Sequence, residues 1–510
     1  MRQYETFELS LRGPELSDNW AQADVKAEFT HNDETVTVPG FYAGDGVYKV
    51  RFLPMEAGEY TFRVTGTVSG EGREICESAV THGPVRIRGR GFAYADGTAF
   101  HPFGTTVYAL AHQSGELTER TMETLSAAPF NKVRMCVFPK DYDFNKNEPD
   151  LYAFEKSADG SWDVDRPCFA FWDALEKHIS RLGQMGIQVD LILFHPYDRW
   201  GFDGLGHERD LVYLDYLLRR LAAFPNIWWS LANEYELTCR TREKWYGIEH
   251  FVSEHDPYGH PLSCHNIFTI WDANRPLTTH ASIQSKDISQ LNGWINRFSG
   301  KPVIVDECAY EGDIEPFWGS ITGAEMSRRF WRCVSQGAYC THGETFYSDD
   351  DVLWWARGGV LKGESPERIA FCRKIIEALP GQLEGEPSYL QQFLPVLKMG
   401  EAERARVLGE LPEDRVWIVR AFLESGEDAA SYANAEIGWY GHIGTDVYLR
   451  FHDTRPITRD TVDLPEDKKY TIHVLDTWNM TDEIVAAGVS GKYTVKLPGR
   501  ENMAVLITFE

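Results

Sequence analysis

The sequence reads IWWSLANE over residues 227–234 and KPVIVDE over residues 301–307. Each stretch opens with an apolar run, as a strand buried on both faces does, and then stops at a carboxylate. In a (β/α)8 barrel, the carboxyl ends of the strands carry the active-site groups. The two stretches therefore predict that Glu234 and Glu307 lie together at one end of a barrel.

The middle of the chain, residues 91–380, alternates apolar strands with helical patterns, which is typical of repeated β-α units around a parallel sheet. Eight strands are predicted, at residues 100–108, 132–139, 188–196, 227–234, 261–266, 278–283, 302–307 and 338–346. Helices are expected at residues 169–185, 210–224, 325–336 and 365–379. Because no glycine-rich phosphate loop follows any of these strands, a doubly wound open sheet is disfavoured.

The flanking segments predict a multi-domain chain that combines α/β and all-β parts. Residues 1–90 alternate apolar and polar positions between turns, which indicates an N-terminal Ig-like β-sandwich with a last strand at 83–91. Residues 381–510 are expected to form a C-terminal β-sandwich after a polar helical stretch near 399–410. Its strands are predicted at residues 416–422, 446–451 and 504–509.

The composition excludes some classes of partner. Lys and Arg number 51 against 77 Asp and Glu, a net charge of -26, and phosphate binding needs clustered positive charge, so no nucleic-acid partner is expected. No apolar run has the length of a membrane span or a signal peptide, so no membrane partner is expected. The nine cysteines lack metal-type spacing, which favours reduced thiols in a cytoplasmic protein.

Two glutamates at the ends of two barrel strands, the fourth and the seventh, suit the cleavage of a glycosidic bond. One carboxyl group attacks the anomeric carbon while the other protonates the leaving oxygen. Glu307 is the candidate nucleophile and Glu234 the candidate acid/base, with Asn233 beside the sugar as a ligand for a ring hydroxyl. The rival carboxylates are Asp306, Glu311 and Glu344, and strand alternation is expected to turn Asp306 away from the side that Glu307 faces.

Other polar residues at strand ends are candidate substrate ligands. Arg134 on the second strand needs a carboxylate partner if it is buried, either the nucleophile or a structural ion pair. The remaining candidates lie on the third, fifth, sixth and eighth predicted strands: His195, His265 with Asn266, His280 and His342. Imidazoles also suit zinc or iron, so a metal-dependent barrel hydrolase is the rival chemistry, although no two-histidine helical motif is present.

Aromatic residues follow the same strands, and they make up 13% of the chain. Tyr310, Trp354 and Trp355 are the candidates for stacking against a sugar ring, with the packing of loops as the alternative. Of these, Trp354 or Trp355 is expected to form the floor of the sugar site.

With these residues in view, the barrel resembles the retaining glycoside hydrolases of clan A, and within them a family 5-like, apiosidase-like branch. The resemblance rests on Asn233-Glu234, Glu307, Arg134, His195 and a tryptophan after the eighth strand. Segments 40–54, 94–100 and 476–481 are similar to the front domain, the start of the barrel and the closing β-domain of that architecture. The resemblance implies two carboxyl groups close together and a double-displacement mechanism.

The expected function is that of a retaining β-glycosidase acting on short oligosaccharides or glycosides, with exo action. Its partner is a small carbohydrate, no metal or cofactor is required, and a homo-oligomer is possible. A carbohydrate-binding protein without catalysis is the remaining alternative. The sequence does not name the sugar.

Overall fold

The computed structural model describes residues 1–387, 390–435 and 438–510. The chain divides into two compact units. The first comprises Met1–Gln284, Gly300–Ile321 and Thr341–Gly363, and the second comprises Ser285–Ser299, Thr322–Cys340 and Glu364–Glu510.

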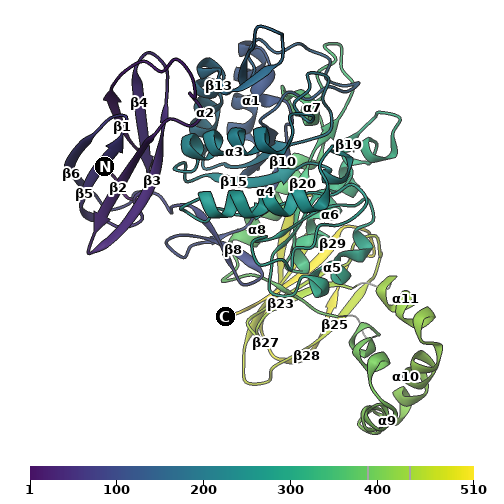
Figure 1. Ribbon diagram of the computed structural model, residues 1–510. Helices are drawn as coiled ribbons and strands as arrows, with labels where there is room; N and C mark the ends of the chain where they lie inside the picture. The colour runs from purple at the N-terminus through teal and green to yellow at the C-terminus, as the bar shows by residue number, and fades with distance from the viewer. Residues whose placement is uncertain (388–389, 436–437) are drawn as a thin grey trace. The chain divides into compact units, whose positions relative to one another are not determined.

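A parallel sheet of eight strands forms the nearly closed barrel. The order in the sheet is β16-β15-β14-β11-β10-β20-β18-β17, and a parallel bridge between His265 and Ser282 joins its two edges (Figure 1). The strands are β10 Phe103–Thr106, β11 Lys132–Cys136, β14 Gln188–Phe194, β15 Ile227–Ala232, β16 Leu262–Ser263, β17 Ala281–Gln284, β18 Val303–Glu307 and β20 Tyr339–His342. The predicted barrel is confirmed: seven of the eight strands lie within their predicted segments, and β17 extends one residue beyond its segment, to Gln284.

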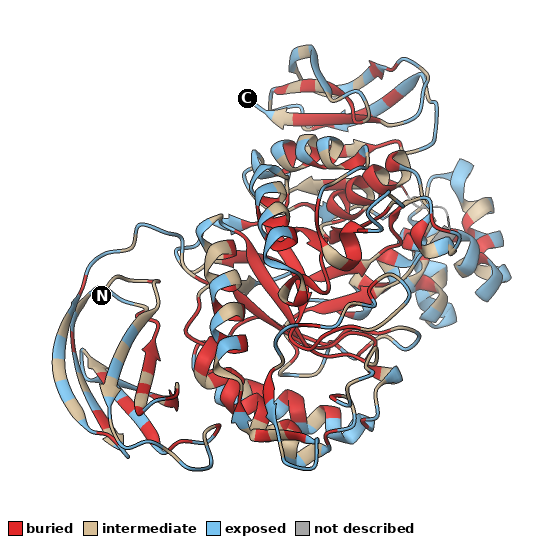
Figure 2. Ribbon diagram, turned by 90° about the horizontal axis from the view of Figure 1, so that it is seen from above, coloured by how far each residue is buried: buried red, intermediate tan, exposed pale blue. Residues whose placement is uncertain are grey.

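Burial explains why these strands could be found in the sequence. Every residue of β11, β14 and β15 is buried; β14 and β15 are mostly apolar, whereas β11 also carries the buried Lys132 and Arg134. Figure 2 shows buried residues concentrated on the barrel strands. The helices of the first unit are α1 Gly115–Ala127, α2 Phe169–Gln184, α3 His207–Leu221, α4 Arg242–His255 and α7 Trp354–Arg357, and β12 Phe154–Lys156 pairs with β13 Trp162–Pro167.

A polar network fills the interior of the barrel. The Lys132 ammonium lies 2.8 Å from Oδ1 of Asp306 and 2.7 Å from Oδ2 of Asp190, and all three side chains are buried. The hydroxyls of Ser282 and Thr341 donate to Asp306 at 2.6 and 2.8 Å. Because a buried charge is costly unless it is paired and hydrogen-bonded, these contacts from five strands favour one arrangement of the barrel.

The N-terminal sandwich is built from β1 Phe7–Arg12, β2 Val25–His31, β3 Glu34–Tyr42, β4 Val47–Phe52, β5 Gly58–Gly66 and β6 Gly70–Cys76. The long strand β3 pairs with β2 through its first part and with β4 through its last part. Across the core, the rings of Phe29 and Phe52 stack at 4.1 Å.

The predicted last strand of this sandwich is wrong. The segment 83–91 contributes β7 Val85–Arg88, which pairs with β8 Gly91–Tyr94 in a separate sheet completed by β9 Ala99–Phe100. Phe92 of that sheet packs 4.8 Å from the ring of Trp228, near the start of β15. The apolar positions of this segment therefore serve the amino-terminal end of the barrel.

The second unit contains helices and an antiparallel β-sandwich. Three of its helices are α5 Leu291–Arg297, α6 Gly323–Ser335 and α8 Ser365–Glu377; the main sheet has the order β22-β23-β24-β29-β26-β27, and β25 pairs with β28. The strands are β22 Glu384–Gly385, β23 Trp439–Ile443, β24 Val447–Phe451, β25 Arg459–Leu464, β26 Tyr470–Asp476, β27 Thr481–Val489, β28 Gly491–Lys496 and β29 Met503–Phe509. A Cβ at Gly441 would lie 2.0 Å from the Ser335 carbonyl oxygen, so only glycine permits this approach of β23 to α6.

The strand predicted at 416–422 is wrong, because this segment lies in helix α10 Glu413–Ser425, between α9 Glu401–Gly409 and α11 Glu427–Ala435. Val419 and Phe422, three residues apart on one helical face, are buried, whereas Trp417 is 68% exposed. The run is apolar enough for a buried strand, but its burial follows the helical period. No helix within the described residues is long and apolar enough to cross a membrane.

Candidate active site

The two predicted glutamates lie at the carboxyl ends of two barrel strands, β15 and β18. Glu234 comes two residues after β15 and opens the short 3-10 helix Tyr235–Leu237 with a left-handed φ of 51°. Glu307 is the last residue of β18, and its side chain is 11% exposed. A left-handed glutamate is uncommon and typically marks a constrained site, and here it turns the chain sharply at the carboxyl end of β15.

A tyrosine contacts each glutamate. The hydroxyl of Tyr197 is hydrogen-bonded to Oε2 of Glu234, and the hydroxyl of Tyr108 is hydrogen-bonded to Oε1 of Glu307. Tyr108 also reaches Oδ1 of Asn233 at 3.0 Å. Burial, followed by the adjacent carboxylates, raises the pKa of both tyrosines, so both remain protonated donors at neutral pH.

Glu307 also lies beside the predicted arginine. Nη1 of the fully buried Arg134 is 3.7 Å from Oε1 of Glu307, and its Nε is 3.4 Å from Oδ2 of Asp190. The structure thus brings Arg134 both to Glu307 and to the interior ion-pair network. Burial raises the pKa of Glu307, and the charge of Glu234 raises it further, while Arg134 and Lys140 act against this rise.

The expected orientation of Asp306 is wrong. Along β18 the pairing with β17 slips by one residue, so that Ile283 pairs with Val305 and Gln284 pairs with Glu307. This β-bulge interrupts strict alternation, and Asp306 and Glu307 both face the barrel interior. Asp306 is committed to Lys132, Ser282 and Thr341, which leaves Glu307 as the carboxylate next to Asn233 and Glu234.

The four histidines do not converge on one site. His265 lies at the pair, with Nε2 4.0 Å from Oε1 of Glu307, and burial lowers its pKa well below the usual value. His195 bonds the Phe138 carbonyl oxygen at 3.1 Å, and burial lowers its pKa to about 3. His280 precedes β17 and packs against the rings of Phe92 and Trp228 at the opposite end of the barrel.

The remaining predicted ligands divide between the site and the scaffold. Asn266 is bonded to the backbone of Gln284, so it ties β16 to β17. The ring of Tyr310 lies 5.5 Å from that of Trp355, which in turn lies 6.0 Å from Tyr108. Trp354 points elsewhere, because its Nε1 donates to Thr105 at 2.9 Å. Of the two tryptophans, Trp355 is therefore the one beside the carboxylates.

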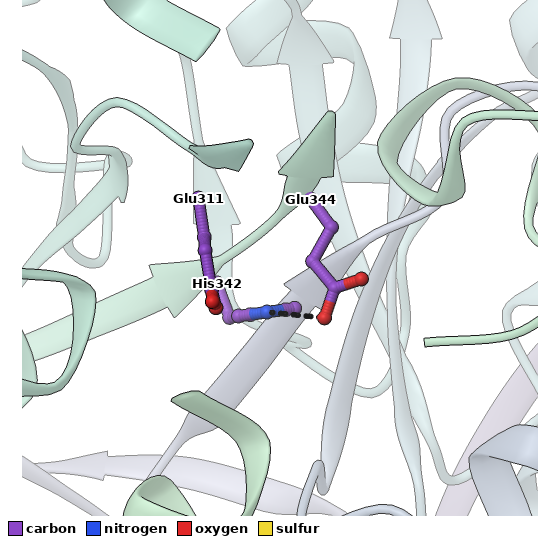
Figure 3. Close-up of side chains that lie close together, drawn as sticks. All are labelled: Glu311, His342 and Glu344. Carbon is purple, nitrogen blue, oxygen red and sulfur yellow. Dashed lines mark ion pairs between the residues drawn. The ribbon is translucent and has the colours of Figure 1, made fainter. Parts of the chain in front are cut away.

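One group of described side chains has the donor set of a metal site: Glu311, His342 and Glu344, whose ligand atoms all lie within 4.8 Å of one another (Figure 3). Thr341 points inward to Asp306, so alternation turns His342 outward, where its ring stacks on Phe130 at 4.7 Å. Oε2 of Glu344 accepts from Lys362 N at 2.7 Å and Oε1 accepts from Gly363 N at 3.1 Å. These bonds give Glu344 a structural role, in holding the backbone of the loop after α7.

Sequence reasoning missed three residues of the site: Tyr197, Lys140 and Tyr142. The Lys140 ammonium lies over the rings of Tyr197 and Tyr142, at 4.3 and 4.9 Å from their centroids. Their signal was positional, because Tyr197 directly follows the predicted strand 188–196 and Lys140 directly follows the predicted strand 132–139. Residues just past a strand end reach the active-site side of a barrel as readily as its last residues do.

Comparisons with known proteins agree with this geometry. Residues 87–377 match the family described as "Apiosidase-like, catalytic domain", and residues 1–67 and 438–508 match two domains of unknown function, DUF5060 and DUF5605. A crystal structure from Bacteroides vulgatus ATCC 8482, provisionally assigned as a glycoside hydrolase, is 32% identical, covers 100% of this chain and 99% of its own, and has a TM-score of 0.84.

A second crystal structure from the same organism, a glycoside hydrolase family 5 protein, is 14% identical and has a TM-score of 0.59. The match covers 84% of this chain and 94% of that one, and at this identity it shows the fold alone. No curated protein sequence matches the chain.

Proposed function

Because the chain belongs to the apiosidase-like catalytic-domain family and is a glycoside hydrolase with a family 5-like barrel, we propose that it cleaves β-glycosidic bonds by double displacement. The observation that carries this proposal is the pair Glu234 and Glu307. Each lies at the carboxyl end of a parallel barrel strand, each is hydrogen-bonded to its own tyrosine, and the charge of Glu234 raises the pKa of Glu307.

In the first half-reaction, a carboxylate oxygen of Glu307 attacks the anomeric carbon and forms a covalent glycosyl-enzyme. The bond to the leaving oxygen breaks, and that oxygen takes the proton of Glu234. In the second half-reaction, Glu234 removes a proton from water, which attacks the anomeric carbon and releases Glu307. Tyr108 and Arg134 hold Glu307 in place, and Tyr197 holds Glu234.

The position of Asn233 supports its proposed role as a ligand for the sugar. Its Oδ1 accepts from Tyr108, so its amide is held next to the nucleophile, and it is 1% exposed. An amide in that place binds a ring hydroxyl near the reacting carbon and accelerates the reaction if the bond strengthens in the transition state. We propose short glycosides as substrates, with exo action.

The test is a panel of nitrophenyl α- and β-glycosides, pyranose and furanose, with the wild type and Glu307→Gln. Release from a β-glycoside by the wild type, with a loss of roughly 10⁴-fold or more in the variant, is the expected result. The anomer formed first, followed by proton NMR, should retain the β configuration.

Glu311→Gln is the matched control, because it removes another buried glutamate that lies apart from the pair. It should keep most of the activity once circular dichroism shows that it is folded. Full activity in Glu307→Gln, or an inverted first product, would overturn the proposal.

A further inference from the structure

A lysine lies among the aromatic rings that surround the two glutamates. Lys140 follows β11 and is 2% exposed. Its ammonium is 3.5 Å from the ring centroid of Tyr108 and 4.3 Å from that of Tyr197, with Tyr142 at 4.9 Å and Trp355 at 5.8 Å. A buried cation over ring faces is held by the negative potential of those faces.

The two nearest rings are those that serve the glutamates. The hydroxyl of Tyr108 contacts Glu307 and the hydroxyl of Tyr197 contacts Glu234, so the ammonium lies over both donors at once. A cation over a phenol ring withdraws electron density and makes its hydroxyl a better donor. Lys140 can therefore stabilise negative charge on either glutamate through the tyrosine between them.

The other buried cations of the barrel are already paired. Lys132 and Arg134 lie among Asp190 and Asp306, two cations against two anions. Among the residues that the structure describes, Lys140 forms no ion pair of its own with either glutamate. Arg134 also lies 3.7 Å from Glu307, so Lys140 is the second buried cation available to the two glutamates, and it lies over the rings of both tyrosines.

The negative charge of the two glutamates moves during a double displacement. It lies on Glu307 before attack and on Glu234 once Glu307 is an ester and Glu234 has given up its proton. We propose that Lys140 is a positioning residue, the shared counter-ion of both glutamates, acting through Tyr108 and Tyr197. This inference rests on the mechanism proposed above.

The first test compares Lys140→Met, which removes the charge and keeps the length, with Lys140→Arg, which keeps the charge. We expect Lys140→Met to lower kcat by about 10- to 100-fold with little change in KM. The acid limb of its kcat/KM profile should move to higher pH, because Glu307 loses a cation that favours its ionised form. Lys140→Arg should keep most of the wild-type kcat and leave the acid limb of the pH profile where it is in the wild type. If both variants lose kcat equally and the acid limb moves in neither, the proposal is overturned.

A double-mutant cycle tests the route through the tyrosines. In a Tyr197→Phe background, Lys140→Met should cost less than it does in the wild type, because part of its effect passes through that hydroxyl. In a Tyr142→Phe background the two effects should multiply, because the Tyr142 hydroxyl has no hydrogen-bond partner within the described chain. Multiplicative effects in both backgrounds would overturn the route.

A measurement without turnover separates this inference from the proposed function. The carboxyl carbon of Glu307 can be titrated by NMR in the ¹³C-glutamate-labelled full chain and assigned by its loss in Glu307→Gln. Its pKa should be higher in Lys140→Met than in the wild type. An unchanged pKa would overturn the counter-ion whatever the panel shows, whereas a shifted pKa in a protein that cleaves no glycoside would overturn the proposed function alone.

Discussion

Asp306 and Glu307 are consecutive residues, and both face the interior of the barrel because a β-bulge at Asp306 interrupts the alternation of β18. Their surroundings shift the pKa values of the two carboxyl groups in opposite directions. Burial opposes the ionisation of Asp306, but Lys132 and Arg134 outweigh it and hold its pKa well below the usual range. Burial and Glu234 raise the pKa of Glu307. Asp306 is thus an ionised structural carboxylate, whereas the surroundings of Glu307 disfavour its ionised form.

The first prediction is that Glu307→Gln stabilises the protein near neutral pH. A carboxyl group whose pKa is higher in the folded state binds more protons there, so its contribution to stability falls as the pH rises from the unfolded pKa through the folded one. The melting temperature of the variant should exceed that of the wild type at about pH 7, with the gain shrinking toward about pH 4. Scanning calorimetry at several pH values measures this, and a lower melting temperature at neutral pH would contradict it.

The second prediction concerns Asp306→Asn, which should destabilise the fold. It leaves the Lys132 charge in the dry interior with only Asp190 opposite, and breaking a buried pair costs about 3–5 kcal/mol. The depressed pKa of Asp306 contributes stability above its unfolded pKa that is lost as pH falls, so the penalty should be largest at neutral pH. Urea denaturation measures the loss. The control Ser282→Ala removes one hydrogen bond to the same carboxylate and should cost about 1 kcal/mol.

The barrel was predictable because its strands are buried on both faces. The run before Glu234 is apolar at nearly every position. Even the two-residue strand Leu262–Ser263 lies within its predicted segment, and Ala281–Gln284 extends only one residue beyond its own. The placement of Glu234 and Glu307 at one end of the barrel was also predictable, because the carboxyl ends of all strands in a parallel barrel lie at the same end. The contact between Arg134 and Glu307 followed from the cost of burying an unpaired guanidinium.

The rest depended on features that a single sequence does not display. A one-residue bulge turns the side chain of Asp306 toward the barrel interior. The bulge is visible in the pairing of β18 with β17, and no residue type in the sequence marks it. His342 lies at a strand end but points outward, and His280 precedes its strand. Proximity to a strand end in the sequence therefore did not predict whether these histidines reach the site. The run 416–422 is apolar enough for a strand, but its burial follows the helical period.

The third prediction is that Tyr197→Phe slows the enzyme most where protonation of the leaving group matters. Without the hydroxyl, the Glu234 carboxyl loses its contact and its fixed orientation. We expect a loss of about 10- to 100-fold in kcat/KM for alkyl glycosides and a smaller loss for nitrophenyl glycosides, which need little protonation. The slope of log kcat/KM against leaving-group pKa measures this. Tyr142→Phe, which removes a hydroxyl without a hydrogen-bond partner in the described residues, should leave that slope unchanged.

The fourth prediction separates the glycosidase from a metal-dependent hydrolase. Glu344 uses both carboxylate oxygens to hold Lys362 N and Gly363 N, and Glu234 and Glu307 have their own partners in Tyr197 and Tyr108. Glu344→Ala should therefore cost about 1 kcal/mol of stability, because two partly buried backbone amides lose their acceptor, while kcat at a temperature well below unfolding stays within about twofold. Extended dialysis against a chelator should leave turnover unchanged in the wild type and in Glu344→Gln. Loss of turnover in chelator, restored by added zinc or manganese, would instead assign catalysis to a bound ion and remove the support for Glu307 as nucleophile.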